Sequence, residues 1–466
     1  MADEYRVEKD TMGEMRVPKN ALYAAQTQRA VENFPVSGQP MPPEFVHALG
    51  LVKLACARVN HARGKIDGKT IEAIEKAARE VADGKWDAEF PIDVFQTGSG
   101  TSSNMNANEV IATRATQILG GTKVHPNDHV NMGQSSNDVI PTTMHVAAVL
   151  QIENELLPAL RELHGSLTQK ALQFDGIVKM GRTHLMDAVP IRLGQEFSGY
   201  ARQIELGIER VEATLPGLRE LAIGGTALGT GLNAPEGFGG MVAEELTRLT
   251  GTQFAEAKNH FEAQGAQDAY AFTAGALSTV AGSMMKIAND IRLMGSGPQG
   301  GLGELMLPAI QPGSSIMPGK VNPVICESVV QVGAQVQGNS LAISIGQQWG
   351  QMDLNVMLPM MTRNLLESVR LLTNVSIVFK SKLLDGLEAN KTRAESYVEK
   401  SISMATALNP LIGYEKAAAI AKESYKTGRT VREIAYEKSG LTKQQVDEAL
   451  EPHKQTVPGG EGAAGG

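Results

Sequence analysis

Five long stretches of the chain repeat apolar residues every three or four positions, which is the pattern of amphipathic α-helices. Each stretch is far longer than the mean helix of about 11–12 residues, so together they predict an elongated helical bundle. Their broad apolar stripes predict burial on several faces, partly against other copies of the chain. Pro158 lies inside the first stretch and is expected to kink it. The stretches span residues 141–173, 193–215, 263–294, 324–349 and 359–385.

Shorter elements are expected on both sides of this bundle. Residues 5–17 alternate apolar and polar positions around Gly13, which predicts a β-hairpin and the only prominent β feature of the chain. Short helices are expected at 43–64, 70–83, 413–428, 430–439 and 442–450. The predicted domains are an N-terminal domain at 1–138, the long-helix bundle at 139–392, a small C-terminal helical domain at 393–456 and a disordered tail at 457–466.

Composition narrows the class of protein. The 466 residues are 42% hydrophobic and 20% charged, as in ordinary globular proteins. A dispersed net charge of -8 argues against nucleic acid as a partner. No apolar run reaches the ~18 residues of a membrane span, and residues 1–4 show no signal pattern. Two cysteines are too few for a disulfide framework or a zinc cage, so a cytoplasmic location is expected.

Hydroxyl and amide side chains dominate two segments of the N-terminal part, residues 95–109 and residues 125–138. Either segment alone is most simply a solvated turn, and the first is expected to cap a helix that begins near Asn106. Two such segments in one domain favour a pocket for a polar ligand. Neither has His or Cys residues at metal-ligand spacing, so no catalytic metal and no cofactor is expected.

Residues 313–323 place two hydroxyls, a lysine and an amide between glycines and prolines, directly before the apolar run from Val324. Gly and Pro indicate a loop, and the start of a helix favours anions. Such a loop is often only a connection between elements. A nucleotide-binding P-loop is not expected, because Ser314 stands where that motif needs Gly and Val321 follows the lysine. The remaining functional interpretation is a loop that holds a carboxylate and moves a proton.

Two further segments carry weaker signals. His184 follows Arg182 and Thr183 between the first two long helices; a lone His is more often structural, although the neighbouring Arg raises the chance of an anion site. The Gly-rich linker at 222–240 lacks a complete G-x-G-x-x-G motif and shows no βαβ context. A dinucleotide site is therefore not expected there.

The polar segments together resemble the signatures of the fumarase/aspartase superfamily, and within it the iron-independent class II fumarases. The resemblance covers nearly the whole chain, with the motifs in family order. His184, where aspartases typically carry Gln, and Gly319 favour fumarases over aspartases. Argininosuccinate and adenylosuccinate lyases share the last loop but diverge in the other motifs. The motifs that carry the resemblance lie at residues 97–106, 125–128, 134–138, 181–184, 313–323 and 408–414.

This resemblance implies reversible trans addition of water to fumarate, giving L-malate, as in the tricarboxylic acid cycle. Ser314 matches the base, His184 the group that handles water, and Glu327 the carboxylate that orients this His. Substrate binding is implied for Ser99, Thr101, Ser135, Ser136, Asn137, Thr183, Ser315, Lys320 and Asn322. A second, non-catalytic anion site is implied for His125, Asn127 and Asp128.

The resemblance also implies a mainly all-α fold in which five long helices per chain form the 20-helix core of a homotetramer. Each active site would be assembled from three chains. His129 departs from the family pattern, since relatives often carry Asp there, and this changes the charge expected near the second anion site. Two alternative functions remain open: an aspartate ammonia-lyase of the same superfamily, and a non-enzymatic scaffold on the same fold.

Overall fold

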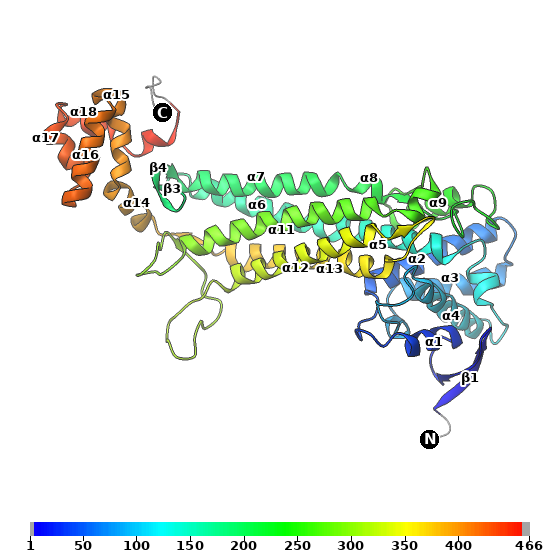
Figure 1. The fold of residues 1–466 in the computed structure, drawn as a ribbon. Coiled ribbons are helices and arrows are strands. Elements are labelled where there is room, and N and C mark those ends of the chain that lie inside the picture. Colours follow the sequence, from blue (N-terminus) through cyan, green and yellow to red (C-terminus); the bar gives the residue numbers. More distant parts are fainter. Residues whose placement is uncertain (1–3, 459–466) are drawn as a thin grey trace. The chain divides into compact units, whose positions relative to one another are not determined.

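The structure is a computed structural model that describes residues 4–458, and it is mainly helical, as predicted (Figure 1). It divides into two compact units built from interleaved segments of the chain. Unit 1 consists of Met1–Pro158, Glu209–Ala281 and Val332–Thr373. Unit 2 consists of Ala159–Ile208, Gly282–Gln331 and Asn374–Gly466. The domain limits predicted at residues 138 and 392 stay a prediction.

Long helices run from one unit into the other. They are α6 (Leu157–Gln173), α7 (Leu193–Glu212), α11 (Asp268–Met294), α12 (Val324–Gln347) and α13 (Leu358–Phe379). Each follows one of the long apolar periodicities of the sequence. Their inward positions, such as Leu163, Ile204 and Leu365, are almost completely buried. The hydrophobic effect therefore holds these helices along the stripes that the sequence predicts.

Unit 1 contains the N-terminal elements and the short segments between long helices. Its strands are β1 (Tyr5–Asp10), β2 (Gly13–Pro18), β5 (Glu220–Leu221), β6 (Ala255–Glu256), β8 (Gly350–Gln351) and β9 (Leu354–Asn355). Its helices are α1 (Ala25–Asn33), α2 (Pro43–Ala62), α3 (Gly68–Ala82), α4 (Thr101–Ile118), α5 (Ser136–Gln151), α8 (Leu215–Leu218), α9 (Phe238–Thr250) and α10 (His260–Gly265). Single turns lie at η1 (Asp87–Glu89), η2 (Pro126–Val130) and η3 (Ile152–Leu156).

Unit 2 contains a hairpin and the C-terminal helices. Its strands are β3 (Val178–Thr183), β4 (Met186–Arg192), β7 (Leu305–Met306) and β10 (Glu388–Ala389). Its further helices are α14 (Lys391–Lys400), α15 (Asn409–Ile412), α16 (Tyr414–Thr427), α17 (Val431–Lys438) and α18 (Lys443–Ala449). Shorter turns are η4 (Lys380–Leu384), η5 (Ile402–Leu408) and η6 (His453–Thr456). Of the tail predicted at 457–466, residues 459–466 lie outside the described part.

The N-terminal hairpin is confirmed, since β1 pairs antiparallel with β2 and Asp10 faces Gly13 across the turn. The expectation that it is the only prominent β feature is wrong, because β3 and β4 form a second antiparallel hairpin. Val178 and Met180 of β3 share a hydrophobic core with α14, α16 and α17, and β3 lies beside α14 in Figure 1. Packing against residues more than 200 positions later stabilises these strands, and the local sequence pattern carries no sign of it.

Some helix limits also differ from the predictions. Helix α4 begins at Thr101, not near Asn106, because the Gln96 side chain accepts hydrogen bonds from Ser103 N–H and Oγ and secures the first turn. The helix expected at 263–294 is divided at Ala266, whose backbone is extended. A π-helical turn, η3, ends two residues before Pro158, whose ring nitrogen cannot donate to the preceding turn. Across the described residues, no helix is both long and apolar enough to cross a membrane.

Candidate active site

The loop before α12 is closed by its own backbone and by one amide side chain. Gly313 N–H donates to Lys320 O at 2.9 Å, and Asn322 Nδ2 donates to Gly313 O at 2.6 Å. A Cβ at position 313 would lie 2.4 Å from Lys320 O, so this close approach requires glycine. The predicted loop therefore has a defined geometry, and the Asn322 side chain closes it.

Ser314 lies inside this closed loop and is half-buried. Its Oγ accepts hydrogen bonds from the backbone N–H groups of Ile316 and Met317, each at 3.2 Å. Donors fixed around an oxygen in this way stabilise negative charge on it, which an alkoxide base needs. The loop also lines a concavity of about 520 Å³. Ser315 and Lys320 are exposed, as suits groups that meet a ligand from solvent.

His184 occupies the tip of the β3–β4 hairpin. Thr183 pairs with Met186, so His184 and Leu185 form a two-residue turn. Both residues have left-handed backbone angles, with φ of 56° and 63°. Such turns normally use Asn or Gly because a Cβ is strained there. Strain at an exposed His is typical of residues kept for function.

A buried ion-pair network stabilises strand β3 of this hairpin. Glu304 is fully buried and contacts Lys179 Nζ at 3.2 Å and Arg182 Nη1 at 2.9 Å. Lys179 also binds Glu196 at 2.9 Å. Burial raises the pKa of the Glu196 carboxyl, and the Lys179 ammonium opposes that rise. Arg182, which the sequence suggested for an anion site, is therefore bound to a buried carboxylate and supports the position of His184.

Hydroxyl groups of unit 1 form a continuous chain of hydrogen bonds. Ser99 Oγ lies 2.8 Å from Thr101 Oγ1, which in turn lies 2.9 Å from Ser136 Oγ. Gly100 allows this arrangement because it caps α4 in the left-handed conformation, with φ of 71°. The two polar segments that the sequence suggested for one pocket do meet, at the N-termini of α4 and α5.

The start of α5 is fixed by a capping box. The Ser135 side chain accepts a bond from Asn137 N–H at 3.2 Å, and Asp138 Oδ1 accepts one from Ser135 N–H at 2.9 Å. Asn137 Nδ2 donates to Ala227 O at 2.7 Å. Several of the predicted binding residues are thus held in place by neighbouring backbone and still lie only half-buried.

The predicted second anion site lies on η2. The His125 ring accepts hydrogen bonds from the N–H groups of Asn127 and Asp128 at 3.3 and 3.1 Å, and Nδ1 lies 3.2 Å from the Asp128 carboxylate. His129 Nδ1 accepts the N–H of His125 at 2.8 Å. His129, the departure from the family pattern, therefore has a local structural contact. His125 and Asn127 also line a pocket of about 750 Å³.

The predicted residues thus fall into two groups. Ser99, Thr101 and Ser136 are joined directly in unit 1, whereas Ser314, Lys320 and Asn322 share the loop of unit 2. Thr183 and His184 lie on the hairpin, and Glu327 is exposed in the first turn of α12. Within the described residues, neither the His184 ring nor the Glu327 carboxylate has a side-chain hydrogen bond, so a single chain does not join this predicted pair.

Two buried ionisable side chains next to the polar segments of unit 1 were not predicted from the sequence. Lys53 of α2 is fully buried, and burial lowers its pKa to about 7. Asp138 is also fully buried, and burial raises its pKa to about 6 against three backbone N–H donors. A lone lysine in the apolar run at 45–57, and a carboxylate three positions after Ser135, were the available signals.

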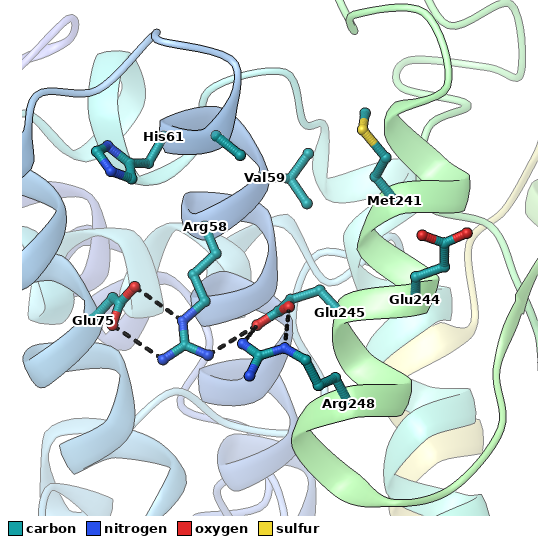
Figure 2. A pocket seen from close by; sticks show the side chains of 9 residues that line it. Arg58, Val59, His61, Glu75, Met241, Glu244, Glu245 and Arg248 are labelled. Atoms are coloured by element: carbon teal, nitrogen blue, oxygen red, sulfur yellow. Dashed lines mark hydrogen bonds and ion pairs between the residues drawn. The ribbon is translucent and has the colours of Figure 1, made fainter.

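Another pocket, of about 610 Å³, lies between α2, α3 and α9 and contains none of the predicted residues. Figure 2 shows how its charges pair with one another: Arg58 binds Glu75 and Glu245 at 2.9 Å each, and Arg248 also binds Glu245. These side chains are partly exposed, and pairs of this kind contribute little to stability. The pocket holds no free charge aimed at a ligand among these four residues and is not the candidate site.

Comparisons with known proteins agree with this geometry. Residues 13–338 match the family described as Lyase, and residues 404–456 match Fumarase C C-terminus. The chain is 57% identical to Fumarate hydratase class II of Corynebacterium efficiens over 96% of both chains. It is 58% identical to the protein of that name from Mycobacterium tuberculosis, over 93% of this chain and 91% of the relative. The class II fumarase structure from Schistosoma mansoni matches with a TM-score of 0.94 at 40% identity, covering 97% of this chain and 99% of that one. The chain belongs to the class II fumarase family of the fumarase/aspartase superfamily and has its all-α fold.

Proposed function

We propose that this chain is a fumarate hydratase, a lyase that adds water reversibly to fumarate to give L-malate. The observation that carries the proposal is 57% identity along 96% of both chains with a protein named for this activity. The closed loop around Ser314 and the strained turn at His184 fit the two proton transfers that the reaction needs.

The chemical difficulty is the removal of a proton from carbon beside a carboxylate. In the dehydration of L-malate, the Ser314 alkoxide takes this proton and leaves a dianionic aci-carboxylate. His184 then gives a proton to the hydroxyl on the opposite face, which leaves as water and yields fumarate. Backbone N–H groups of Ile316 and Met317 support the charged form of Ser314. Glu327 orients and charges His184 in this mechanism.

One lysine and a set of neutral hydroxyl and amide donors hold the substrate. The loop before α12 binds one substrate carboxylate through Lys320, Asn322 and Ser315. Hydroxyls and amides of the other segments bind the remaining part of the substrate. The residues assigned to this second group are Ser99, Thr101, Ser135, Ser136, Asn137 and Thr183. His125, Asn127 and Asp128 form a separate anion site that takes no part in the chemistry.

The proposed assembly is a homotetramer in which 20 long helices form the core and three chains complete each active site. Large apolar side chains remain exposed along the long helices of the single chain, including Phe272 of α11 and Leu341 of α12 at 61% and 63%. Such exposed apolar positions favour association with further copies. A second copy would also supply the partner that the His184 ring lacks in one chain. The proposed location of the tetramer is the cytoplasm.

The test is a paired assay of the purified protein with L-malate and L-aspartate. Growth of the ultraviolet absorbance of fumarate from malate, with a higher kcat/KM than from aspartate, is the expected result. A preference for aspartate would instead identify an ammonia-lyase. Absence of turnover with both substrates, in a protein that is folded and tetrameric by light scattering, would identify a scaffold and refute the proposal.

A further inference from the structure

We propose that Lys53 is a positioning residue for substrate binding, which ties together the polar segments that carry the binding hydroxyls and amides of unit 1. The inference rests on the proposed function, since it assigns a task at that active site. Lys53 touches none of the residues predicted to bind substrate. It acts through the segments on which they lie.

Lys53 Nζ donates to two side-chain oxygens of the segment that follows η2. Nζ lies 2.8 Å from Asn131 Oδ1 and 2.9 Å from Gln134 Oε1. Asn131 follows η2, which carries the predicted second anion site, and Gln134 comes directly before Ser135. One buried side chain therefore fixes both ends of the segment between these two sites.

The same acceptor connects the other polar segment. Asn104 of α4 donates from Nδ2 to Asn131 Oδ1 at 3.3 Å, three residues after Thr101. A second side chain of α2, Asn60, donates to Met132 O at 3.0 Å. Gln134 Nε2 donates to Val130 O and Met132 O at 3.1 and 3.2 Å. The segments at 101–104 and 130–135 thus share one network, in which Lys53 Nζ and Asn104 Nδ2 donate to the same Asn131 oxygen.

Asp138 provides the negative charge that faces Lys53. Its Oδ2 accepts the N–H groups of Gly224 and Thr226 at 3.1 and 2.9 Å, while Oδ1 accepts Ser135 N–H. Cys56 also faces Lys53, but burial raises the pKa of its thiol to about 12, so the thiol is neutral. Lys53 and Asp138 are both fully buried, and Asp138 holds the backbone of Ser135 at the N-terminus of α5.

Packing alone does not account for a lysine at this position. An isolated buried ammonium is expensive, and an apolar side chain of the same length is often neutral or stabilising in such a place. The surroundings of Lys53 are apolar, with Leu49, Val52, Leu54 and Cys56 all buried. The gain from the lysine is instead a fixed geometry for Asn131 and Gln134, and this geometry sets the position of the neighbouring binding residues.

The experiment compares Lys53→Met with Lys170→Met in the full-length assembled enzyme. Lys170 is the matched control: it is also buried and donates to Gln173 Oε1 and Leu387 O, at 2.9 and 2.7 Å, neither of which belongs to a predicted site residue. In Lys53→Met we expect KM for L-malate to rise about tenfold with kcat within about threefold, because the loosened groups bind rather than react. In Lys170→Met we expect both parameters to stay within twofold of the wild type.

A second variant, Asn131→Ala, removes the acceptor that Lys53 and Asn104 share. It should raise KM about as much as Lys53→Met does, and the double variant should raise KM no further than the larger single effect. Unchanged KM in a folded Lys53→Met enzyme, or an equal rise in Lys170→Met, overturns the inference. If Lys53→Met does not fold, Asn131→Ala decides: a tenfold rise supports the network, and unchanged KM refutes it. An inactive wild type refutes the proposed function and this inference together, whereas an active wild type with unaffected variants refutes this inference alone.

Discussion

Gly98 allows two backbone segments of unit 1 to meet beside the candidate site. Its carbonyl accepts the N–H of Leu358 at 3.0 Å, at the start of α13. A Cβ at position 98 would lie only 1.8 Å from Val356 O and 2.7 Å from the carbonyl carbon of Val356. Both atoms belong to the backbone, so no side-chain rotation relieves the overlap. We therefore predict that Gly98→Ala disturbs the adjacent Ser99.

The size of the effect follows from that distance. Real Cβ atoms essentially never approach closer than 3.0 Å, so the two segments must separate by about 1 Å. A misplacement of about 1 Å at a substrate-positioning group lowers the rate about 100-fold. The overlap itself should destabilise the fold by about 1–3 kcal/mol, as overpacking does. We expect kcat/KM for L-malate to fall about 100-fold and the melting temperature to fall measurably.

The matched control is Gly68→Ala, at the first residue of α3. A Cβ there has no neighbour within 4 Å, so activity and melting temperature should stay at wild-type values. The assay is the appearance of fumarate from malate, together with thermal unfolding followed by circular dichroism. A Gly98→Ala enzyme with kcat/KM within threefold and an unchanged melting temperature would refute the reasoning, because it would show that the segment at Val356 moves without effect on Ser99.

Further predictions concern the base, the hairpin and acid stability. Ser314→Ala should lower kcat for L-malate by about 10²–10⁴-fold with little change in KM, since a general base is lost; kcat within tenfold of wild type would contradict the base assignment. His184→Gln should lower kcat at least about 100-fold without lowering the melting temperature, because the side chain is exposed, and a large loss of stability would show a structural role instead. Glu80 binds Arg114 at 2.7 Å, and this guanidinium lowers the pKa of the Glu80 carboxyl below its ordinary 4.5. The pair therefore stabilises the fold above about pH 4.5 and loses this contribution as the pH falls through the lowered pKa. The stability advantage of wild type over Glu80→Gln, measured by urea unfolding, should shrink between pH 6 and pH 3.5; a constant difference would contradict it.

The sequence predicted most of the architecture because long helices reveal themselves locally. The stripe at 359–385, for example, matches α13 and η4 almost residue for residue. The loop at 313–323 was equally predictable, because glycine allows unusual backbone angles and proline fixes φ wherever they occur. The family motifs then supplied candidate residues on both the loop and the hairpin.

What the sequence did not reveal depends on partners far along the chain. The turn at His184 and Leu185 contains neither Gly nor Asn, so no local signal marks it. Its strands are stabilised by Val398, Ile420 and other residues of the C-terminal helices. Lys53 likewise acquires its role only when Asn131 and Gln134 approach α2 in the folded unit. Local pattern cannot show contacts of this kind.

The interleaved composition of the two units has a consequence for biosynthesis. Unit 1 needs the segment Val332–Thr373, so its packing cannot be completed until most of the chain has left the ribosome. Until then, the apolar surface of the N-terminal helices stays exposed. Nascent chains in this state aggregate or bind chaperones. No cut in the chain releases either unit whole. Expression of a single fragment should therefore give insoluble protein.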